Sequence, residues 1–338
     1  MKRVLIRGGL MTASGYGTHA RQIFRWISNQ KDVEITSQLL PWGITSWLVD
    51  RTLENGLIDK IIKTSMTPSG KYDLSVQIQL PNEWDPKLAD INVGVTALVE
   101  TDICNKDWID AINSMHLVIV PSEHVKQTIL RTGLVTTNLF VIPESYPDDI
   151  DDLDLEPLDL KLDTDFNFLL VGQMTGNTAI TDRKNLFNTV KWICEVFADN
   201  PNVGIILKTN SGRSTVLDKF TTESIVQETL SQVREGPYPK VHLIHGNMTT
   251  REICSLYKTP TVKCFVSLTR GEGFGLPLLE AAASGLPVIA TNWSGHLDFL
   301  KLGKFIPVNY NLEPVHKSRV DGRIFIEGAK WAEPSESD

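Results

Sequence analysis

One stretch of the sequence, residues 266–290, constrains the fold more than any other: V-S-L-T-R-G-E-G-F-G-L-P-L-L-E-A-A-A-S-G-L-P-V-I-A. It begins in a short apolar strand, expected over residues 264–268, and continues into a loop with three glycines in residues 271–275. A helix is expected from Leu276, because the proline that follows suits a first helical turn. A strand, a glycine loop and a helix start in this order direct free backbone N–H groups and the positive end of a helix dipole at an anion.

Two carboxylates flank this loop, Glu272 within it and Glu280 on the helix, with seven residues between them. A phosphate held by backbone groups beside two acceptor-only side chains suits a ligand that carries both phosphate and hydroxyls, and a nucleotide sugar is such a ligand. The plain alternative is a strand-to-helix turn whose glycines serve only tight packing, and a glycine-rich loop alone would not decide between the two.

The segment resembles the E-x7-E signature of the retaining glycosyltransferases of family 4, among the group 1 glycosyl transferases. The resemblance rests on E-G-F-G-L-P-L-L-E-A, on the following G-L-P-V-I-A, and on P-S-E-H-V-K at residues 121–126. It implies the GT-B fold, in which two Rossmann-like parallel-sheet domains face each other across a cleft. It further implies transfer of a hexosyl or pentosyl group with retention at the anomeric carbon, without a metal.

The length of 338 residues and the alternation of expected strands and helices independently favour two α/β domains with parallel sheets. We expect an acceptor-side domain over residues 1–143 and a nucleotide-sugar domain over residues 166–338. Residues 144–165 carry ten acids against one lysine, together with two prolines, and are expected to form an acidic linker. Its D-x-D triplets lie in a solvated acidic run, so we expect no metal site there.

Composition narrows the class of protein. Hydrophobic residues make up 41% and charged residues 22%, as in a globular chain, and no apolar run approaches the roughly 20 residues of a membrane span. The N-terminus is expected to be a strand over residues 2–7 and not a signal peptide, so a cytoplasmic location is expected. The four cysteines form no C-x-x-C pair, so we expect no disulfide and no structural zinc site. The sequence contains no basic run of the kind that indicates nucleic-acid binding.

The first domain offers candidate residues for the acceptor and for the phosphates of the donor. A glycine-rich loop at residues 14–17 follows the first strand and includes Gly15, Tyr16 and Gly17; it is either a ligand loop or an ordinary turn. Glu100 and Asp102 follow a strand expected over residues 91–98, at the sheet edge where ligands gather in doubly wound folds. Either Glu100 orients or deprotonates the acceptor, or it only caps the next helix. Residues 41–70 are expected to be irregular, and their tryptophans, Trp42 and Trp47, line a groove or pack in the core.

Transfer from a nucleotide sugar requires positive charge at the leaving diphosphate. The candidates are the side chains of Arg183, Lys184 and Lys208. Backbone N–H groups of the glycine loop add to them, at Gly273, Phe274, Gly275 and Leu276. The resemblance assigns Glu272 to the hydroxyls of the donor sugar and Glu280 to the ribose. No cofactor is expected beside the nucleotide-diphosphate sugar.

The sequence departs from the family pattern in three places. Gln173 stands where the family usually has arginine, E-T-D at residues 100–102 replaces a common histidine, and the chain stops at W-A-E-P-S-E-S-D where relatives continue into a helix. The acceptor hydroxyl stays open among glycans, proteins, lipids and a hydroxymethylated DNA base. A sugar phosphorylase or nucleotide-sugar hydrolase on the same scaffold, or a non-catalytic sugar-nucleotide binding protein, are the alternatives.

Overall fold

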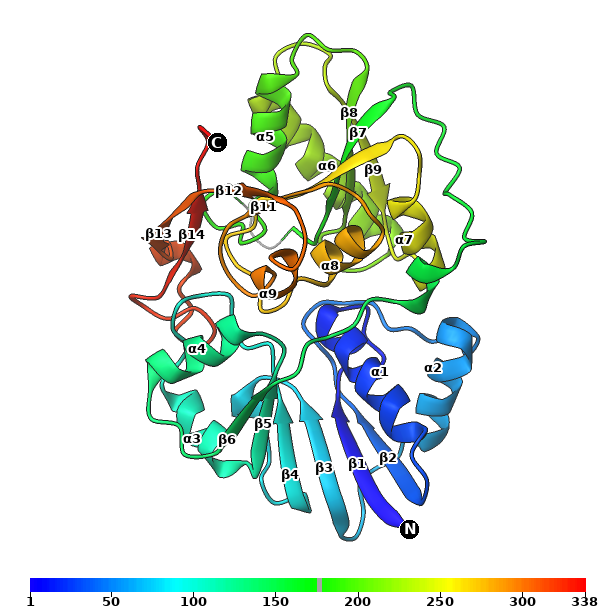
Figure 1. Cartoon of the computed structure of the whole chain (residues 1–338), viewed down its shortest axis with the longest axis vertical. Coiled ribbons are helices and arrows are strands. Elements are labelled where there is room, and N and C mark those ends of the chain that lie inside the picture. The colour runs from blue at the N-terminus through cyan, green and yellow to red at the C-terminus, as the bar shows by residue number, and fades with distance from the viewer. Residues whose placement is uncertain (175–177) are drawn as a thin grey trace. The chain divides into compact units, whose positions relative to one another are not determined.

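The computed structural model describes residues 1–174 and 178–338, which form two compact units (Figure 1). Unit 1 consists of Met1–Ser145 and Val320–Ala329, and unit 2 consists of Tyr146–Arg319 and Lys330–Asp338. A six-stranded parallel sheet with helices forms the centre of each unit. The expectation of an α/β chain with two Rossmann-like parallel-sheet domains is therefore confirmed.

The sheet of unit 1 has the strand order β2-β1-β3-β4-β5-β6. Its strands are β1 (Lys2–Gly8), β2 (Val33–Leu39), β3 (Tyr72–Ile78), β4 (Ala89–Val95), β5 (Leu117–Val120) and β6 (Asn138–Val141). Strand β1 pairs with β2 on one side and with β3 on the other. The order in which successive strands are added to this parallel sheet therefore reverses at β1. Ligands of doubly wound folds gather at such a reversal, beyond the carboxyl ends of the strands.

Two groups of helices cover the two faces of this sheet. Helices α1 (Gly15–Ser28) and α2 (Leu53–Thr64) share one apolar cluster with β1 and β3, whereas α3 (Asp107–Ser114) and α4 (Glu123–Thr132) pack in another cluster with β5. Helix α2 lies within residues 41–70, where no helix was expected, so that expectation was wrong. Near its start, Glu54, Asn55 and Gly56 have left-handed backbone conformations, and this kink interrupts the helical pattern of the sequence.

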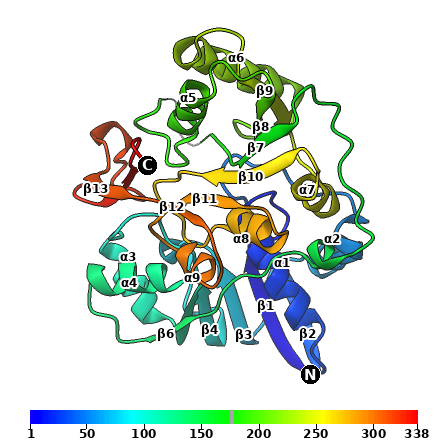
Figure 2. The same ribbon diagram turned by 45° about the horizontal axis from the view of Figure 1, so that its top comes forward.

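The sheet of unit 2 has the order β12-β11-β10-β7-β8-β9 (Figure 2). Its strands are β7 (Phe166–Val171), β8 (Val203–Thr209), β9 (Lys240–His245), β10 (Val262–Ser267), β11 (Val288–Thr291) and β12 (Ile306–Val308). Helices α5 (Leu186–Val196) and α6 (Val216–Val233) pack on one face. The opposite face carries α7 (Thr250–Tyr257), α8 (Leu276–Ala283) and α9 (Leu297–Leu300). A separate antiparallel hairpin, which was not expected, joins β13 (Tyr310–Pro314) to β14 (Lys330–Pro334).

The acidic segment over residues 144–165 is more ordered than the linker expected from its charge. A short 3-10 helix, Asp148–Asp151, occurs in it, and its Ile150 and Leu155 are buried against Cys254 of α7. Arg251 of the same helix binds Asp149 and Asp152, each of which is the first aspartate of a D-x-D triplet. From Tyr146 onward this segment is therefore part of unit 2.

The expected boundary near the C-terminus also differs from the structure, because Val320–Ala329 belongs to unit 1. There Asn105 donates to the carbonyls of Gly322 and Arg323, and Ile324 packs against the apolar cluster of α3 and α4. Within residues 1–174 and 178–338, no helix has the length and apolar character that crossing a bilayer requires.

Candidate functional site

The glycine loop lies between β10 and α8, as expected, and its geometry requires glycine at Gly275. This residue has a φ of 100° and precedes the first turn of α8. A Cβ placed there would lie 3.0 Å from Leu278 Cδ1 and 3.1 Å from His296 Cβ. Pro277 occupies the first turn, and no acidic side chain is present in that turn. The helix start therefore keeps its positive end without a carboxylate of its own.

Glu272 is the centre of the polar contacts of this loop. Its side chain is buried, and its Oε1 lies 2.5 Å from Lys184 Nζ and 3.6 Å from Arg183 Nη1. Burial raises the pKa of this carboxyl, but the charges of Lys184 and Arg183 outweigh it and hold the pKa at about 2. The three expected residues are thus together, with an ionised carboxylate between two cations.

The backbone of Glu272 is held by the segment that follows β11. Its N–H donates to Ser294 Oγ at 2.9 Å, and its carbonyl accepts the N–H of Gly295 at 2.9 Å. Ser294 has a φ of 88°, which is unusual for a residue with a Cβ. His296 is fully buried, with Nε2 2.7 Å from the Thr291 carbonyl and Nδ1 3.4 Å from Ser294 Oγ, and burial lowers its pKa. A neutral His296 that donates from Nε2 can then accept from the Ser294 hydroxyl.

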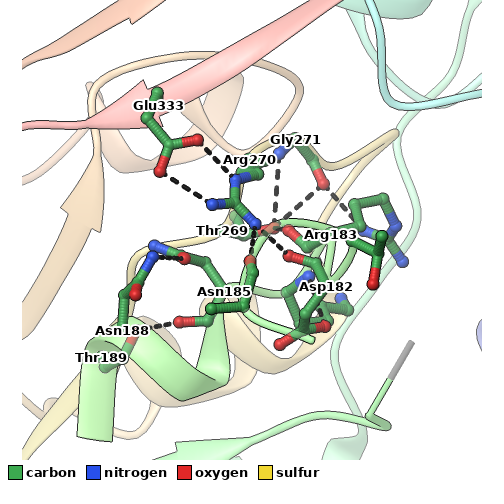
Figure 3. A network of polar contacts seen from close by, with 12 residues as sticks. Asp182, Arg183, Asn185, Asn188, Thr189, Thr269, Arg270, Gly271 and Glu333 are labelled. Atoms are coloured by element: carbon green, nitrogen blue, oxygen red, sulfur yellow. Dashed lines mark hydrogen bonds and ion pairs between the residues drawn. The ribbon is translucent and has the colours of Figure 1, made fainter. Parts of the chain in front are cut away.

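Arg183 and Lys184 are positioned by a buried arginine from the opposite loop, Arg270 (Figure 3). Its Nη1 donates to the carbonyls of Ala179 and Asp182, at 2.6 and 2.7 Å. Its Nε and Nη2 donate to the two carboxylate oxygens of Glu333 on β14, at 2.7 and 2.8 Å. One side chain therefore connects the β7–α5 loop, the glycine loop and the hairpin.

The start of α5 completes this arrangement. The carboxylate of Asp182 is buried and accepts the backbone N–H groups of Lys184 and Leu186, at 3.2 and 2.7 Å. Asn185 has a backbone φ of 55°, in the left-handed region that residues other than glycine and asparagine rarely adopt. The turn R-K-N at residues 183–185 therefore has a physical reason for ending in asparagine.

Glu280 lies on α8, where its Oε2 accepts the hydroxyl of Tyr257 at 3.0 Å. The carboxyl is half-buried, and its low-dielectric surroundings raise its pKa to about 7, although the Tyr257 hydrogen bond acts in the other direction. The two glutamates of the spaced pair thus have opposite electrostatic environments. Cations hold the pKa of Glu272 low, whereas burial keeps the pKa of Glu280 raised.

Lys208 lies at the end of β8, next to the end of β7. Its Nζ donates to the Gly246 carbonyl, and burial lowers its pKa. Its own carbonyl accepts the N–H of Gly172, and a Cβ at Gly172 would be 3.6 Å from Lys184 Cγ. Gly172 is therefore next to Lys208 and to the stem of Lys184, at one edge of the sheet.

The candidates in unit 1 also lie at the carboxyl edge of their sheet. Tyr16 stacks on Trp42 with ring centroids 3.8 Å apart, and its hydroxyl contacts Thr96 Oγ1 at 2.9 Å. Burial raises the pKa of the Tyr16 phenol, and the nearby charge of Glu100 adds to this shift. A Cβ at Gly17 would lie 2.1 Å from the Thr12 carbonyl, so that glycine permits a close backbone approach.

The remaining candidates of unit 1 lie near this tyrosine in the sequence or at the end of β4. Gly15 begins α1 and has open space where a Cβ would be. Glu100 and Asp102 are half-buried in the segment after β4, in which Leu98 has a φ of 56°. Trp42 is half-buried against Tyr16, and Trp47 is 42% exposed.

Sequence reasoning missed four residues that build the site in unit 2: Asp182, Arg270, Ser294 and Glu333. Arg270 precedes the glycine loop by one residue, in T-R-G-E, and its position at the end of a buried strand was an available signal. Ser294 and Gly295 follow β11, at the same edge of the sheet. Glu333 had no such signal, since its partner Arg270 is 63 positions away.

Two comparisons of the sequence found similar proteins. Residues 231–317 match the model of the family described as Glycosyl transferases group 1. A stretch of 75 residues is 36% identical to a sucrose synthase of Melioribacter roseus, and it covers 20% of this chain and 9% of that protein. The matched region thus spans less than a tenth of the length of that relative.

Solved structures resemble the chain over most of its length. A glycosyltransferase from Rickettsia africae has a TM-score of 0.58 at 15% identity and covers 91% of this chain and 84% of its own. The Escherichia coli trehalose-6-phosphate protein bound with UDP-2-fluoro glucose has a TM-score of 0.59 at 9% identity, with 91% and 88% covered. An Anabaena protein in complex with UDP and glucose has a TM-score of 0.54 at 14% identity, with 91% and 86% covered. The chain therefore has the GT-B fold of glycosyltransferases, and its residues 231–317 match the group 1 glycosyl transferase family.

Proposed function

We propose that this protein is a retaining, metal-independent glycosyltransferase that moves a hexosyl or pentosyl group from a nucleotide-diphosphate sugar to an acceptor hydroxyl. The observation that carries the proposal is the contact of Lys184 Nζ with Glu272 Oε1 at 2.5 Å, beside the start of α8. A carboxylate for hydroxyls, two cations and a helix N-terminus are the groups that a sugar diphosphate needs. The similar structures that hold UDP with glucose, or UDP-2-fluoro glucose, support a uridine-diphosphate sugar as the first donor to test.

Lys184 and Arg183 stabilise the negative charge that grows on the leaving diphosphate. Backbone N–H groups of Gly273, Phe274, Gly275 and Leu276 add donors at the helix start. Arg183 and Lys184 are held before substrate binds, because Arg270 and Asp182 fix the backbone of residues 179–186, and preorganised charge of this kind is the largest contribution in many enzymes. Lys208 adds a third cation at the same sheet edge.

Glu272 accepts hydrogen bonds from hydroxyls of the donor sugar, and Glu280 accepts them from the ribose. Because Lys184 and Arg183 keep Glu272 ionised, its carboxylate is an acceptor throughout the physiological pH range. Glu100 and Asp102 of unit 1 orient the acceptor, with Tyr16 and the glycines at positions 15 and 17 in the adjoining loop.

In the proposed reaction, the bond between the anomeric carbon and the diphosphate oxygen breaks, and its electron pair stays on that oxygen. The acceptor oxygen forms the new bond on the same face of the sugar, and its proton passes to the departing phosphate. The products are a glycoside of unchanged anomeric configuration and a nucleoside diphosphate. Proton NMR of the anomeric signal of the first product distinguishes retention from inversion.

The test of the function measures nucleoside diphosphate release from a panel of nucleotide sugars, with and without acceptors and with a chelator present. The acceptors are oligosaccharides, peptides, lipids and hydroxymethylated DNA. Transfer activity is expected to survive the chelator and to be lost in Glu272→Gln, while Glu228→Gln, which changes an exposed carboxylate on α6, keeps it. Donor hydrolysis without any acceptor product would favour a hydrolase, and wild-type rates in Glu272→Gln would contradict the proposal.

A further inference from the structure

Unit 2 contains a cavity of about 320 Å³ to which the proposed transfer reaction assigns no ligand, although Arg270 and Glu333 form part of its wall. We name it the hairpin pocket, because β13, β14 and His316, which lies between these strands in the sequence, supply much of its wall. The polar and aromatic residues that line it are Asn188, Arg270, Glu313, His316, Trp331 and Glu333. Its volume is at the lower end of the roughly 300 to 1,000 Å³ that small-molecule pockets span.

The wall of this pocket is rich in hydrogen-bond acceptors. Glu313 is exposed, and within residues 1–174 and 178–338 its carboxylate has no hydrogen bond or ion pair. Each carboxylate oxygen of Glu333 accepts one N–H from Arg270, and the side chain keeps 36% of its surface exposed. Asn188 uses its amide N–H₂ to donate to Asn185 at 2.8 Å, which leaves its carbonyl oxygen as the acceptor. Such a wall suits a ligand that brings several donors.

The charges of the pocket select among such ligands. The only strong cation among its lining residues, Arg270, is already paired with both oxygens of Glu333. Glu313 therefore leaves the pocket with a negative charge, and a phosphate or carboxylate ligand would be repelled. A neutral sugar offers several O–H donors, no charge to repel and a volume that suits the pocket as a single ring.

We propose that the hairpin pocket binds one neutral sugar unit, as a carbohydrate subsite separate from the site around Glu272. The hydroxyls of that sugar donate to Glu313, Glu333 and Asn188. Ile180, which is 56% exposed, and Pro314 supply apolar wall for the C–H face of the ring. A subsite of this kind suits an acceptor or product that is itself a carbohydrate.

The pocket is also connected to the loop that carries Arg183 and Lys184. Arg270 lines the pocket and donates to the carbonyls of Ala179 and Asp182, and Ala179 itself lines the pocket. A bound sugar therefore contacts the arginine that holds the backbone just before the two cations. This coupling to transfer rests on the proposed function, whereas sugar binding by the pocket does not.

The binding test uses the full chain without donor and observes free monosaccharides, such as glucose, galactose and N-acetylglucosamine, by saturation-transfer NMR. At least one neutral sugar is expected to bind at millimolar concentration. Glu313→Gln is expected to weaken that binding about fivefold, as loss of a charge-assisted hydrogen bond does, and Glu313→Lys is expected to abolish it. Both substitutions lie on an exposed hairpin position, so the fold is expected to be kept, and circular dichroism checks this.

A matched control makes the outcome decisive. Glu228→Gln alters an exposed carboxylate of unit 2 outside the pocket and should leave sugar binding unchanged. Sugar binding that survives Glu313→Lys, absence of any sugar signal, or preference for sugar phosphates or diamines over neutral sugars would each overturn the proposal. Transfer activity without sugar binding in the pocket would support the proposed function and contradict the subsite. Sugar binding in the pocket without transfer activity would support the subsite and contradict the proposed function.

Discussion

Lys184 and Glu272 join two loops that are 88 positions apart in the sequence, with Nζ 2.5 Å from Oε1. Both side chains are largely removed from water, at 17% and 9% exposed. Removing one partner of such a pair leaves the other charge buried without compensation. The contact thus determines both the protonation of Glu272 and the position of the cation proposed to meet the diphosphate.

Replacing Lys184 with methionine keeps the stem of the side chain and removes its charge. Burial then raises the pKa of Glu272 above about 2, because the charge and the hydrogen bond of Lys184 no longer oppose it beside Arg183. We expect the free energy of unfolding to fall by about 3 kcal/mol and transfer to fall by about 100-fold or more. Urea unfolding and steady-state rates measure these two effects.

Lys191→Met is the matched control for this substitution. Lys191 lies on α5 of the same unit but forms exposed ion pairs with Glu195 and Glu336, so its loss should change stability by less than about 1 kcal/mol and leave the rate unchanged. Equal effects of the two substitutions on stability and rate would show that Lys184 has no special role.

The low pKa of Glu272 makes stability depend on pH in a defined direction. A carboxyl with a pKa of about 2 in the folded chain and about 4.5 in the unfolded chain binds fewer protons when folded. Its contribution is present above pH 4.5 and is lost as the pH falls towards 2. The stability difference between the wild type and Glu272→Gln should therefore shrink as the pH is lowered through this window, and a constant difference would contradict the pairing.

Glu280 should show the opposite dependence on pH. Its pKa is raised from 4.5 to about 7, so the folded chain holds a proton that the unfolded chain has lost. This contribution is full below pH 4.5 and disappears as the pH rises through 7. Glu280→Gln should accordingly be more stable than the wild type at pH 8, with no such gain at pH 4, and thermal unfolding at the two pH values tests this. Glu228→Gln, at an exposed position, should give no gain at either pH.

Much of unit 2 was predictable because its signals are local. The strand, loop and helix around Glu272 follow from glycine, proline and apolar spacing over 25 residues. The R-K-N turn at residues 183–185 likewise identifies the loop whose Lys184 contacts Glu272. By contrast, the partners that position this turn come from distant parts of the chain, as Arg270 and Glu333 show. No local pattern encodes such a pairing, and the sequence analysis consequently missed it.

Helix α2 was missed for a different reason. Its apolar residues Leu57, Ile58 and Ile61 are buried at helical spacing, but Glu54, Asn55 and Gly56 before them are left-handed. The propensities of asparagine and glycine favoured a loop, and packing against β1 and β3 stabilises a helix directly after the kink. The acidic segment was misjudged in the same way, because its net charge hid the two apolar residues that anchor it, Ile150 and Leu155.

Ser294 combines backbone strain with a hydrogen bond to the N–H of Glu272. Ser294→Ala keeps the left-handed conformation and leaves that buried N–H without the hydroxyl, which should cost about 1 to 3 kcal/mol. Ser294→Gly loses the same hydrogen bond but relieves the strain, which is worth about 1 kcal/mol. The glycine variant should therefore be the more stable of the two by urea unfolding, and both should have a lower transfer rate. A glycine variant less stable than the alanine variant would contradict this account of the strain.

Arg270 and Glu333 allow the positioning of the cation loop to be tested apart from chemistry. Arg270→Lys keeps a positive charge but cannot make both the paired contact with Glu333 and the two bonds to the carbonyls of Ala179 and Asp182. We expect kcat to fall about tenfold or more, because displaced groups of the β7–α5 loop no longer match the diphosphate. The pKa of Glu272 should rise in this variant if Lys184 moves away from it.

Glu333→Gln separates the hairpin contact from the loop contacts of the same arginine. It removes one partner of Arg270 and leaves the carbonyls of Ala179 and Asp182 in place, so its effect on kcat should be smaller than that of Arg270→Lys. Combining the two substitutions should cost less than the sum of their separate effects, because both act through one network. Additive losses in kcat would show that Glu333 does not act through Arg270, and the hairpin would then have no part in holding the loop.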